Sequence, residues 1–121
     1  MKPPRRKKPR QPGGKSKLEA LLAATLRYVG INDFVQQYKF HPTRNWKADF
    51  AWPEQKIIAE VHGGTWIGGR HVRGKGFAND REKANEAQLM GWLILEFTAD
   101  EVKNASAVNV IARAVDYREA S

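Results

Sequence analysis

The chain has 121 residues, which suits a single domain with a modest hydrophobic core. It contains no cysteine, which excludes a disulfide framework and a metal site built from thiolates. No apolar run is long enough to span a membrane, and the N-terminus lacks the apolar core of a signal peptide, so we expect a cytoplasmic protein without membrane contact.

The excess positive charge lies at the N-terminus. Residues 1–17 contain eight basic residues and no acidic ones, which accounts for the whole formal net charge of +8. Prolines are frequent there and apolar periodicity is absent, so we predict a disordered arm over residues 1–15. Such an arm suits contact with nucleic-acid phosphates, although a solubilising extension would have the same composition. The arm residues expected to bind DNA are Arg5, Arg6, Lys7, Lys8 and Arg10.

The folded domain is expected to cover residues 16–121 and to begin with a helix at Ser16. Apolar residues at helical spacing follow, and Gly30 stands where a C-cap glycine is preferred. Ser16 and Glu19 have the spacing of a capping box. Glu19 therefore has two interpretations, a cap residue or a carboxylate that turns toward the sheet, and both stay open.

Three strands are expected next, over residues 34–40, 46–52 and 57–62. Pro53 suits a tight turn between the second and the third strand. With the turn centred on residues 54–55, Asp49 lies opposite Glu60, and the period of two gives the hairpin one apolar face. The members of this face are Ala48, Phe50, Trp52, Ile57, Ala59 and Val61.

Asp49 and Glu60 form the most informative pair in the sequence. Directly opposed residues of neighbouring strands have Cβ atoms roughly 5 Å apart, and like charges at that separation destabilise a sheet. Protonation of one acid, or a cation between the two, removes the repulsion, and a divalent metal ion with oxygen ligands does so most simply. The alternative is an exposed strand face with scattered acids.

Residues 63–76 contain six glycines, which excludes regular structure over this stretch. Basic side chains are suited to phosphate contacts, and a tryptophan offers a surface on which a base can stack. We therefore expect DNA contacts here, and the alternative is an irregular loop with an ordinary basic surface. The residues concerned are Trp66, Arg70, Arg73 and Lys75.

A second helix is expected from about Phe77 to Gly91, followed by a strand over residues 92–97 whose apolar run predicts burial on both faces. Thr98 and Glu101 have capping-box spacing and precede a last amphipathic helix. The order is helix, three strands, helix, strand, helix. This order predicts an α/β (α+β) fold with a mixed central sheet flanked by helices.

The carboxylate hairpin resembles the core of the restriction-endonuclease-like (PD-(D/E)XK) superfamily. Asp49, ten further residues and then Glu60-Val61-His62 look like its Asp…Glu-x-Lys motif, with histidine in place of the lysine. The later part of the chain is similar to the very-short-patch-repair mismatch endonucleases and to related phage and bacterial proteins. The residues that carry this second likeness are Val61-His62-Gly63, Trp66, His71, Asp80-Arg81, Lys83, Asn85 and Gly91-Trp92-Leu93-Ile94-Leu95.

The resemblance covers about residues 16–114 and implies a single restriction-endonuclease-like domain. It implies a Mg²⁺-dependent DNA endonuclease that hydrolyses phosphodiester bonds in DNA repair, recombination or phage DNA processing, within a bacterial or phage-infected cytoplasm. Asp49, Glu60 and the Val61 carbonyl would bind Mg²⁺, with Mn²⁺ as a possible substitute. One departure is the absence of the cysteines that hold a structural zinc in the mismatch enzymes.

Four other side chains are candidates for the implied chemistry. Glu19 would reach the metal directly or through water, and His62 would orient water or stabilise the phosphate charge. His71 is a further catalytic candidate, and Lys83 would donate to the phosphate. Each also has a plain structural interpretation, since single histidines and charged helix faces are common at protein surfaces.

The rival class is a non-catalytic DNA-binding module that uses the same arm and glycine-rich loop. Its carboxylates would be structural, and it would shift DNA in a gel without cutting it. An RNA-binding accessory protein is a third possibility. The sequence leaves the preferred DNA structure open, and it allows either a monomer that nicks or a homodimer that cuts both strands.

Overall fold

The computed structural model describes residues 14–63 and 75–120. In chain order these residues form α1 (Gly14–Tyr28), β1 (Val35–Lys39), β2 (Lys47–Trp52), β3 (Ile57–His62), α2 (Lys75–Leu89), β4 (Leu93–Thr98), α3 (Ala99–Lys103) and α4 (Ser106–Glu119). This confirms the predicted order of elements, except that the last helix is divided in two at residues 104–105. No helix in this part of the chain combines the length and the apolar character needed to cross a membrane.

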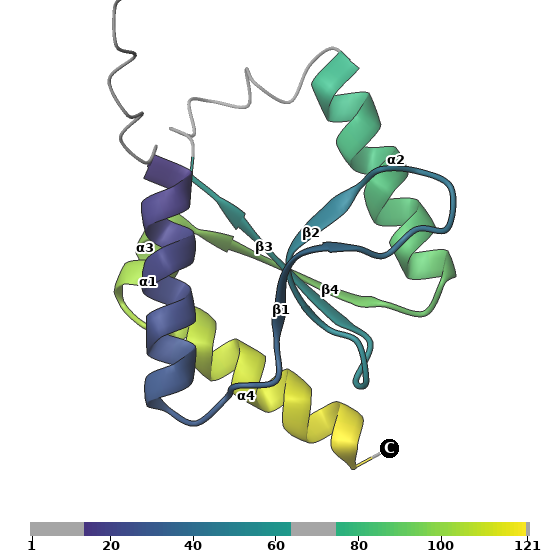
Figure 1. Cartoon of the computed structure of the whole chain (residues 1–121). Helices are drawn as coiled ribbons and strands as arrows, with labels where there is room; N and C mark the ends of the chain where they lie inside the picture. The colour runs from purple at the N-terminus through teal and green to yellow at the C-terminus, as the bar shows by residue number, and fades with distance from the viewer. Residues whose placement is uncertain (1–13, 64–74, 121) are drawn as a thin grey trace, which may run out of the picture.

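The four strands form one mixed sheet in the order β1-β2-β3-β4. The β1–β2 and β2–β3 pairs are antiparallel, and the β3–β4 pair is parallel because α2 carries the chain back across the sheet. In the β2–β3 hairpin Phe50 pairs with Ala59 and Trp52 with Ile57, which confirms the predicted register. Helices α1, α3 and α4 lie on one side of the sheet and α2 on the other (Figure 1).

Each side of the sheet has its own hydrophobic cluster. The larger cluster joins α1, α3 and α4 to the sheet and includes Leu22, Leu26, Phe50, Trp52 and Ile111, each no more than 1% exposed. The smaller cluster lies toward α2, and its members are Phe40, Trp46, Ala48, Ala51, Ile58, Ala87 and Trp92. Ala48 therefore belongs to the smaller cluster, although the period of two placed it with Phe50.

Strand β4 lies at the edge of the sheet. Leu93 and Leu95 pack against the larger cluster and Ile94 against the smaller one, so the apolar run reflects packing on both faces, as predicted. These side chains are nevertheless only half-buried, and within residues 14–63 and 75–120 β4 is an edge strand of the sheet.

Of the two capping boxes predicted from the sequence, the one at the start of α3 forms and the one at the start of α1 does not. At α3, Thr98 Oγ1 accepts a hydrogen bond from the Glu101 N–H at 3.3 Å, and Thr98 N donates to Glu101 Oε1 at 3.0 Å, as predicted. Helix α1 already includes Gly14, so Ser16 lies inside the helix and the predicted box with Glu19 does not form. The spacing of Ser16 and Glu19 in the sequence is the same for an N-cap pair and for two residues within the first turns of a helix, so it did not distinguish these two cases.

Candidate active site

The backbone ladder between β2 and β3 stops one pair short of the predicted carboxylates. Beyond the pair Phe50–Ala59, side chains take over the hydrogen bonds of the two backbones. The Asp49 N–H donates to Glu60 Oε2 at 3.1 Å, and the Val61 N–H donates to Asp49 Oδ2 at 2.9 Å. The two acids therefore lie opposite each other, as predicted, and each is oriented by the backbone of the other strand.

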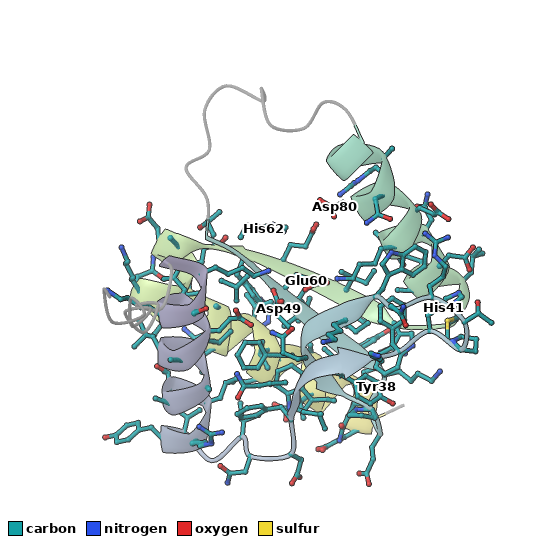
Figure 2. The ribbon with its side chains drawn as sticks, turned by 45° about the horizontal axis from the view of Figure 1, so that its top comes forward. Tyr38, His41, Asp49, Glu60, His62 and Asp80 are labelled. Atoms are coloured by element: carbon teal, nitrogen blue, oxygen red, sulfur yellow. The ribbon has the colours of Figure 1, made fainter. Side chains whose placement is uncertain are left out.

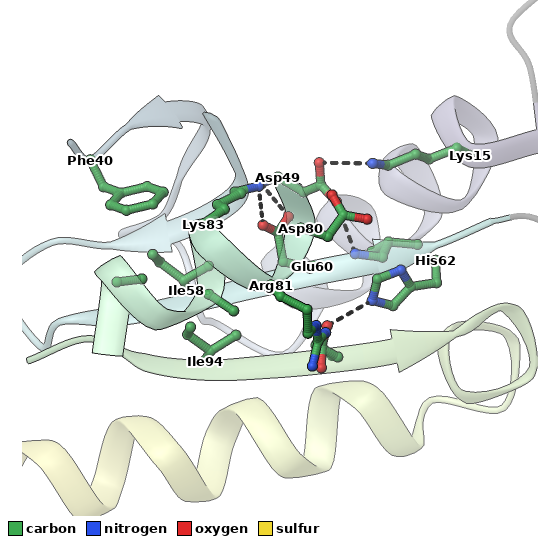
Figure 3. A pocket seen from close by; sticks show the side chains of 14 residues that line it. Lys15, Phe40, Asp49, Ile58, Glu60, His62, Asp80, Arg81, Lys83 and Ile94 are labelled. Carbon is green, nitrogen blue, oxygen red and sulfur yellow. Dashed lines mark hydrogen bonds and ion pairs between the residues drawn. The ribbon is translucent and has the colours of Figure 1, made fainter. Parts of the chain in front are cut away.

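Two lysines compensate the charge of this pair. Lys15 Nζ on α1 lies 3.2 Å from Asp49 Oδ1, and Lys83 Nζ on α2 forms an ion pair with Glu60 Oε1. Lys83 Nζ also donates to the Lys47 carbonyl oxygen at 2.7 Å. Figure 3 shows the lysines reaching the carboxylates from opposite sides of the site. The ammonium groups thus occupy the positions at which an approaching cation would meet the acids.

Lys15 reaches Asp49 because the start of α1 touches the end of β3. A Cβ built on Gly63 would lie 2.7 Å from the Lys15 Cα and 2.9 Å from the Lys15 Cβ, closer than real Cβ atoms approach other atoms. Only glycine fits between the strand and the helix at this point. Gly63 therefore permits the contact that brings the first turn of α1 beside Asp49.

Burial sets the electrostatics of the two acids. Asp49 is only 5% exposed, and Glu60 is largely buried between β2 and α2. Burial raises the pKa of Glu60 above the ordinary value of a glutamate, and the negative charge of Asp49 raises it further, whereas Lys83 opposes the shift. Two carboxylates buried to this extent favour the binding of a cation, because their negative charges have little contact with water.

The acids line a pocket of about 160 Å³ between α1, the sheet and α2. Its floor includes Ile58 and Ile94, and its polar lining includes Lys15, Glu60 and Lys83. Five of the candidate residues line this pocket together: Asp49, Glu60, Val61, His62 and Lys83. Figure 2 shows the pair between α1 and α2, with Asp80 above it.

Sequence reasoning missed several residues of this pocket. Lys15 was assigned to the arm, and Asp80 and Arg81 were quoted only for the likeness to the mismatch endonucleases, without a role at the site. Glu96 also lines the pocket and was not singled out. The signal for Asp80 was present, since it precedes Lys83 by about one helical turn and therefore shares its side of α2.

Glu19 lies outside this pocket. Its carboxylate Oε1 accepts a hydrogen bond of 2.8 Å from Gln37 Nε2, so the side chain turns toward β1. Burial raises the pKa of Glu19, and the charge of Asp49 raises it further, which places the two acids within electrostatic reach. Of the two interpretations left open by the sequence, the structure favours the carboxylate that turns toward the sheet.

The histidines and the DNA-binding candidates divide into described and undescribed residues. His62 lines the pocket, and its Nε2 lies 3.1 Å from Glu96 Oε1 at the exposed end of β3. Lys75 is the first residue of α2, and its side chain lies outside the described part of the structure. The same holds for the whole of His71, Trp66, Arg70, Arg73 and the arm residues Arg5, Arg6, Lys7, Lys8 and Arg10.

The donor set fits a hard divalent ion. Asp49, Glu60 and the Val61 carbonyl offer oxygen only, which is the ligand type that Mg²⁺ prefers. The described residues contain no group of three or more His, Cys, Asp or Glu side chains that could enclose a metal ion.

No family model matches the sequence. Two proteins from different strains of Mycobacterium tuberculosis, each described as an uncharacterized protein, are 29% identical to this chain over 63 residues. That match covers 52% of this chain and 22% of each relative, so the chain spans about a fifth of their length.

A solved structure matches more of the chain. The catalytic domain of the homing endonuclease I-Bth0305I has a TM-score of 0.61 and 20% sequence identity, over 84% of this chain and 95% of that domain. This likeness agrees with the endonuclease-like fold implied by the sequence, without singling out the mismatch endonucleases. The chain therefore has the mixed α/β fold of an endonuclease catalytic domain.

Proposed function

We propose that this chain is a divalent-metal-dependent DNA endonuclease. The observation that carries the proposal is the buried pair Asp49–Glu60, held by reciprocal backbone hydrogen bonds inside a pocket that also receives two lysines. The fold shared with a homing endonuclease catalytic domain supports it. A pocket that combines paired acids with lysine ammonium groups suits the hydrolysis of a phosphodiester, because the acids can hold a metal ion and the lysines can stabilise charge on the phosphate.

In this proposal Asp49, Glu60 and the Val61 carbonyl hold Mg²⁺ or Mn²⁺. When bound, such an ion polarises the scissile phosphate and makes hydroxide available for in-line attack. The Val61 N–H already orients one oxygen of Asp49, so the other oxygen, now paired with Lys15, is left for the cation. Lys15 is half-exposed, so it can leave this pair for a DNA phosphate once the cation takes its place beside the buried Asp49.

Lys83 is proposed to serve in place of the missing motif lysine. The superfamily motif expects a lysine where this chain has His62, but His62 is exposed and paired with Glu96. Lys83 instead projects from α2 and contacts Glu60 itself. Its ammonium group therefore lies where it can stabilise negative charge that develops on the phosphate. His62, whose ring is oriented by Glu96, stays the candidate for orienting water.

The proposed substrate is DNA, bound by the basic arm and the glycine-rich segment. The likeness to mismatch endonucleases makes repair, recombination or phage DNA processing the proposed role. A panel of labelled mismatched, branched and linear duplexes tests this role, because a repair enzyme should cut the first two classes fastest. The size of the products from each strand separates a nicking monomer from a homodimer that cuts both strands.

The decisive experiment is plasmid cleavage. Supercoiled DNA is incubated with the wild-type protein, with Asp49→Ala, and with the matched control Asp33→Ala, which alters an exposed acid in the α1–β1 loop. Each reaction is run with Mg²⁺, with Mn²⁺ and with EDTA. We expect cutting by the wild type and by Asp33→Ala only when metal is present, and none by Asp49→Ala. Intact plasmid in every reaction, with a gel shift, would establish the non-catalytic binding module instead.

A further inference from the structure

Gln37 has an unusual backbone conformation in the middle of β1. Its φ of +52° lies in the left-handed region, where glutamine is uncommon and glycine or asparagine is preferred. The flanking pairs Gln36–Phe50 and Tyr38–Ala48 keep a constant register, so Gln37 lies directly opposite Asp49. The strained residue therefore faces the acid at the centre of the proposed site.

The left-handed turn has a structural consequence. Before it, the ring of Phe34 packs on Phe50 and Trp52 in the larger cluster, with centroids 5.5 and 5.9 Å away. After it, the Tyr38 ring lies 5.9 Å from that of Trp92 in the smaller cluster. The turn at Gln37 thus transfers the strand from one hydrophobic cluster to the other. Glycine would make the same transfer with less strain, so this role does not explain a glutamine.

The side chain of Gln37 makes a hydrogen bond that glycine could not make. Its amide Nε2 donates a hydrogen bond of 2.8 Å to Glu19 Oε1 and so ties α1 to β1. Because Gln37 lies directly opposite Asp49, this hydrogen bond also holds the Glu19 carboxylate at the level of Asp49 in the sheet. A lysine or arginine at position 37 would also hold Glu19 but would neutralise it. A neutral amide fixes the carboxylate and leaves its negative charge available to a cation.

We propose that Gln37 is a positioning residue that holds the Glu19 carboxylate beside Asp49, so that both charges attract one divalent ion. This inference rests on the proposed function, because it assigns Gln37 to the same metal site. Glu19 lines a separate shallow groove on α1 and β1, so it acts on the ion from outside the pocket, through water. The strain at Gln37 is tolerated because the side chain is needed at this backbone position.

The test compares stability with metal affinity. Gln37→Gly relieves the backbone strain and removes the amide, so we expect a melting temperature equal to or above that of the wild type. Affinity for Mn²⁺, measured by calorimetry on the full chain, should nevertheless fall by about tenfold, a usual loss for a residue that orients a metal-site carboxylate. A purely structural role for Gln37 would leave the affinity unchanged.

Two further variants sharpen the test. In a Glu19→Gln background, Gln37→Gly should cause no additional loss of affinity, because the partner through which Gln37 acts is already neutral. Lys56→Gly is the control, since Lys56 also has a left-handed backbone, with a φ of +59°, but lies at the turn end of the β2–β3 hairpin. This control should keep wild-type affinity. Gln37→Asn keeps a residue tolerant of the left-handed region and should also bind Mn²⁺ weakly.

The outcomes separate this inference from the proposed function. Wild-type affinity in Gln37→Gly overturns the role of Gln37, while plasmid cleavage by the wild type keeps the endonuclease. An equal loss with and without Glu19 also overturns it, since Gln37 would then act by another route. A wild-type protein that binds Mn²⁺ without cutting DNA overturns the endonuclease alone. Absence of Mn²⁺ binding by the wild type overturns both.

Discussion

The two ends of the β2–β3 hairpin are built from the same strands for different purposes. At the turn end, Trp52 and Ile57 pair through backbone hydrogen bonds and are almost fully buried. At the open end, Asp49 and Glu60 interrupt the ladder, and their carboxylates bind the backbone in its place. The turn end contributes stability through apolar burial, whereas the open end keeps polar groups dry and needs lysines from two helices to compensate them.

This difference shows how a small domain can tolerate a costly site. Two opposed and buried carboxylates destabilise a sheet, so they are placed next to the best packed part of the core. Phe50 adjoins Asp49 in sequence and is fully buried in the larger cluster. Substitutions of the buried apolar residues should therefore lower mainly the stability, and substitutions of the acids should lower mainly the metal-dependent cleavage. Four predictions test this contrast.

The largest effect is expected for the buried apolar residues of the hairpin. Phe50→Ala should lower the free energy of unfolding by about 3–5 kcal/mol, because it leaves a cavity under α1 and α4. Urea denaturation measures this loss. The control Val35→Ala, at an exposed position on β1, should change stability by no more than about 0.5 kcal/mol. A loss below about 1 kcal/mol for Phe50→Ala would contradict the assignment of stability to these residues.

The next effect concerns the open end. Asp49→Asn and Glu60→Gln should each reduce metal-dependent cleavage by about a hundredfold or more, since each removes a charge that holds the metal. The free energy of unfolding should change by only about 1 kcal/mol, because the amides keep their hydrogen-bonding oxygens. Asp33→Asn and Glu54→Gln, both exposed, are the controls and should cleave normally. Unchanged Mg²⁺ affinity in both site variants would remove the metal site.

A smaller effect is expected for the lysine on α2. Lys83→Met should slow single-turnover cleavage at saturating Mg²⁺ by about tenfold, because the side-chain length is kept while the charge near the phosphate is lost. Lys83→Arg should retain part of the rate. Lys103→Met on α3, an exposed position remote from the pocket, should have no effect. Equal cleavage rates for Lys83→Met and Lys103→Met would show that Lys83 does not serve in place of the motif lysine.

The smallest effect is a dependence of stability on pH. The pKa of Glu60 is raised in the folded protein, so the stabilising contribution of its protonated form is complete below the ordinary value of 4.5 and is lost as pH rises through the raised pKa. The metal-free wild type should therefore lose melting temperature relative to Glu60→Gln as the pH rises from 4.5 toward neutrality. Mg²⁺ should reverse this loss. A difference that stays constant over the range would show that Glu60 titrates normally.

The hairpin and its carboxylate pair could be predicted because they follow from local rules. A period of two and a proline-marked turn determine which residues of neighbouring strands meet, so Asp49 and Glu60 were placed opposite each other correctly. The reciprocal hydrogen bonds to the backbone could not be foreseen, since they depend on where the ladder ends. Ala48 was misplaced because the alternation of β2 breaks between Ala48 and Phe50, opposite the left-handed residue Gln37, and a rule of period two cannot foresee its own interruption.

The acidic partners of the two lysines could not be predicted, because their contacts depend on how the helices pack. Lys83 meets an acid 23 residues away in the chain, across an intervening segment, and no spacing rule predicts such a meeting. Lys15 follows a run of basic residues and was therefore grouped with them. Its pairing with Asp49 requires the close contact at Gly63, which is evident only when α1 and β3 are placed side by side.

The contact between α1 and Gly63 also determines where two other segments are anchored. The basic arm joins the domain at Gly14, and the glycine-rich segment leaves it just after Gly63. A Cβ built on Gly14 would lie 4.0 Å from the Gly63 carbonyl oxygen, so both anchor points lie together beside Asp49. If the proposed function holds, a phosphate bound by either segment would be kept close to the carboxylates along the chain. The effective concentration of the DNA strand at the site would then be higher, so weak binding by each segment would suffice.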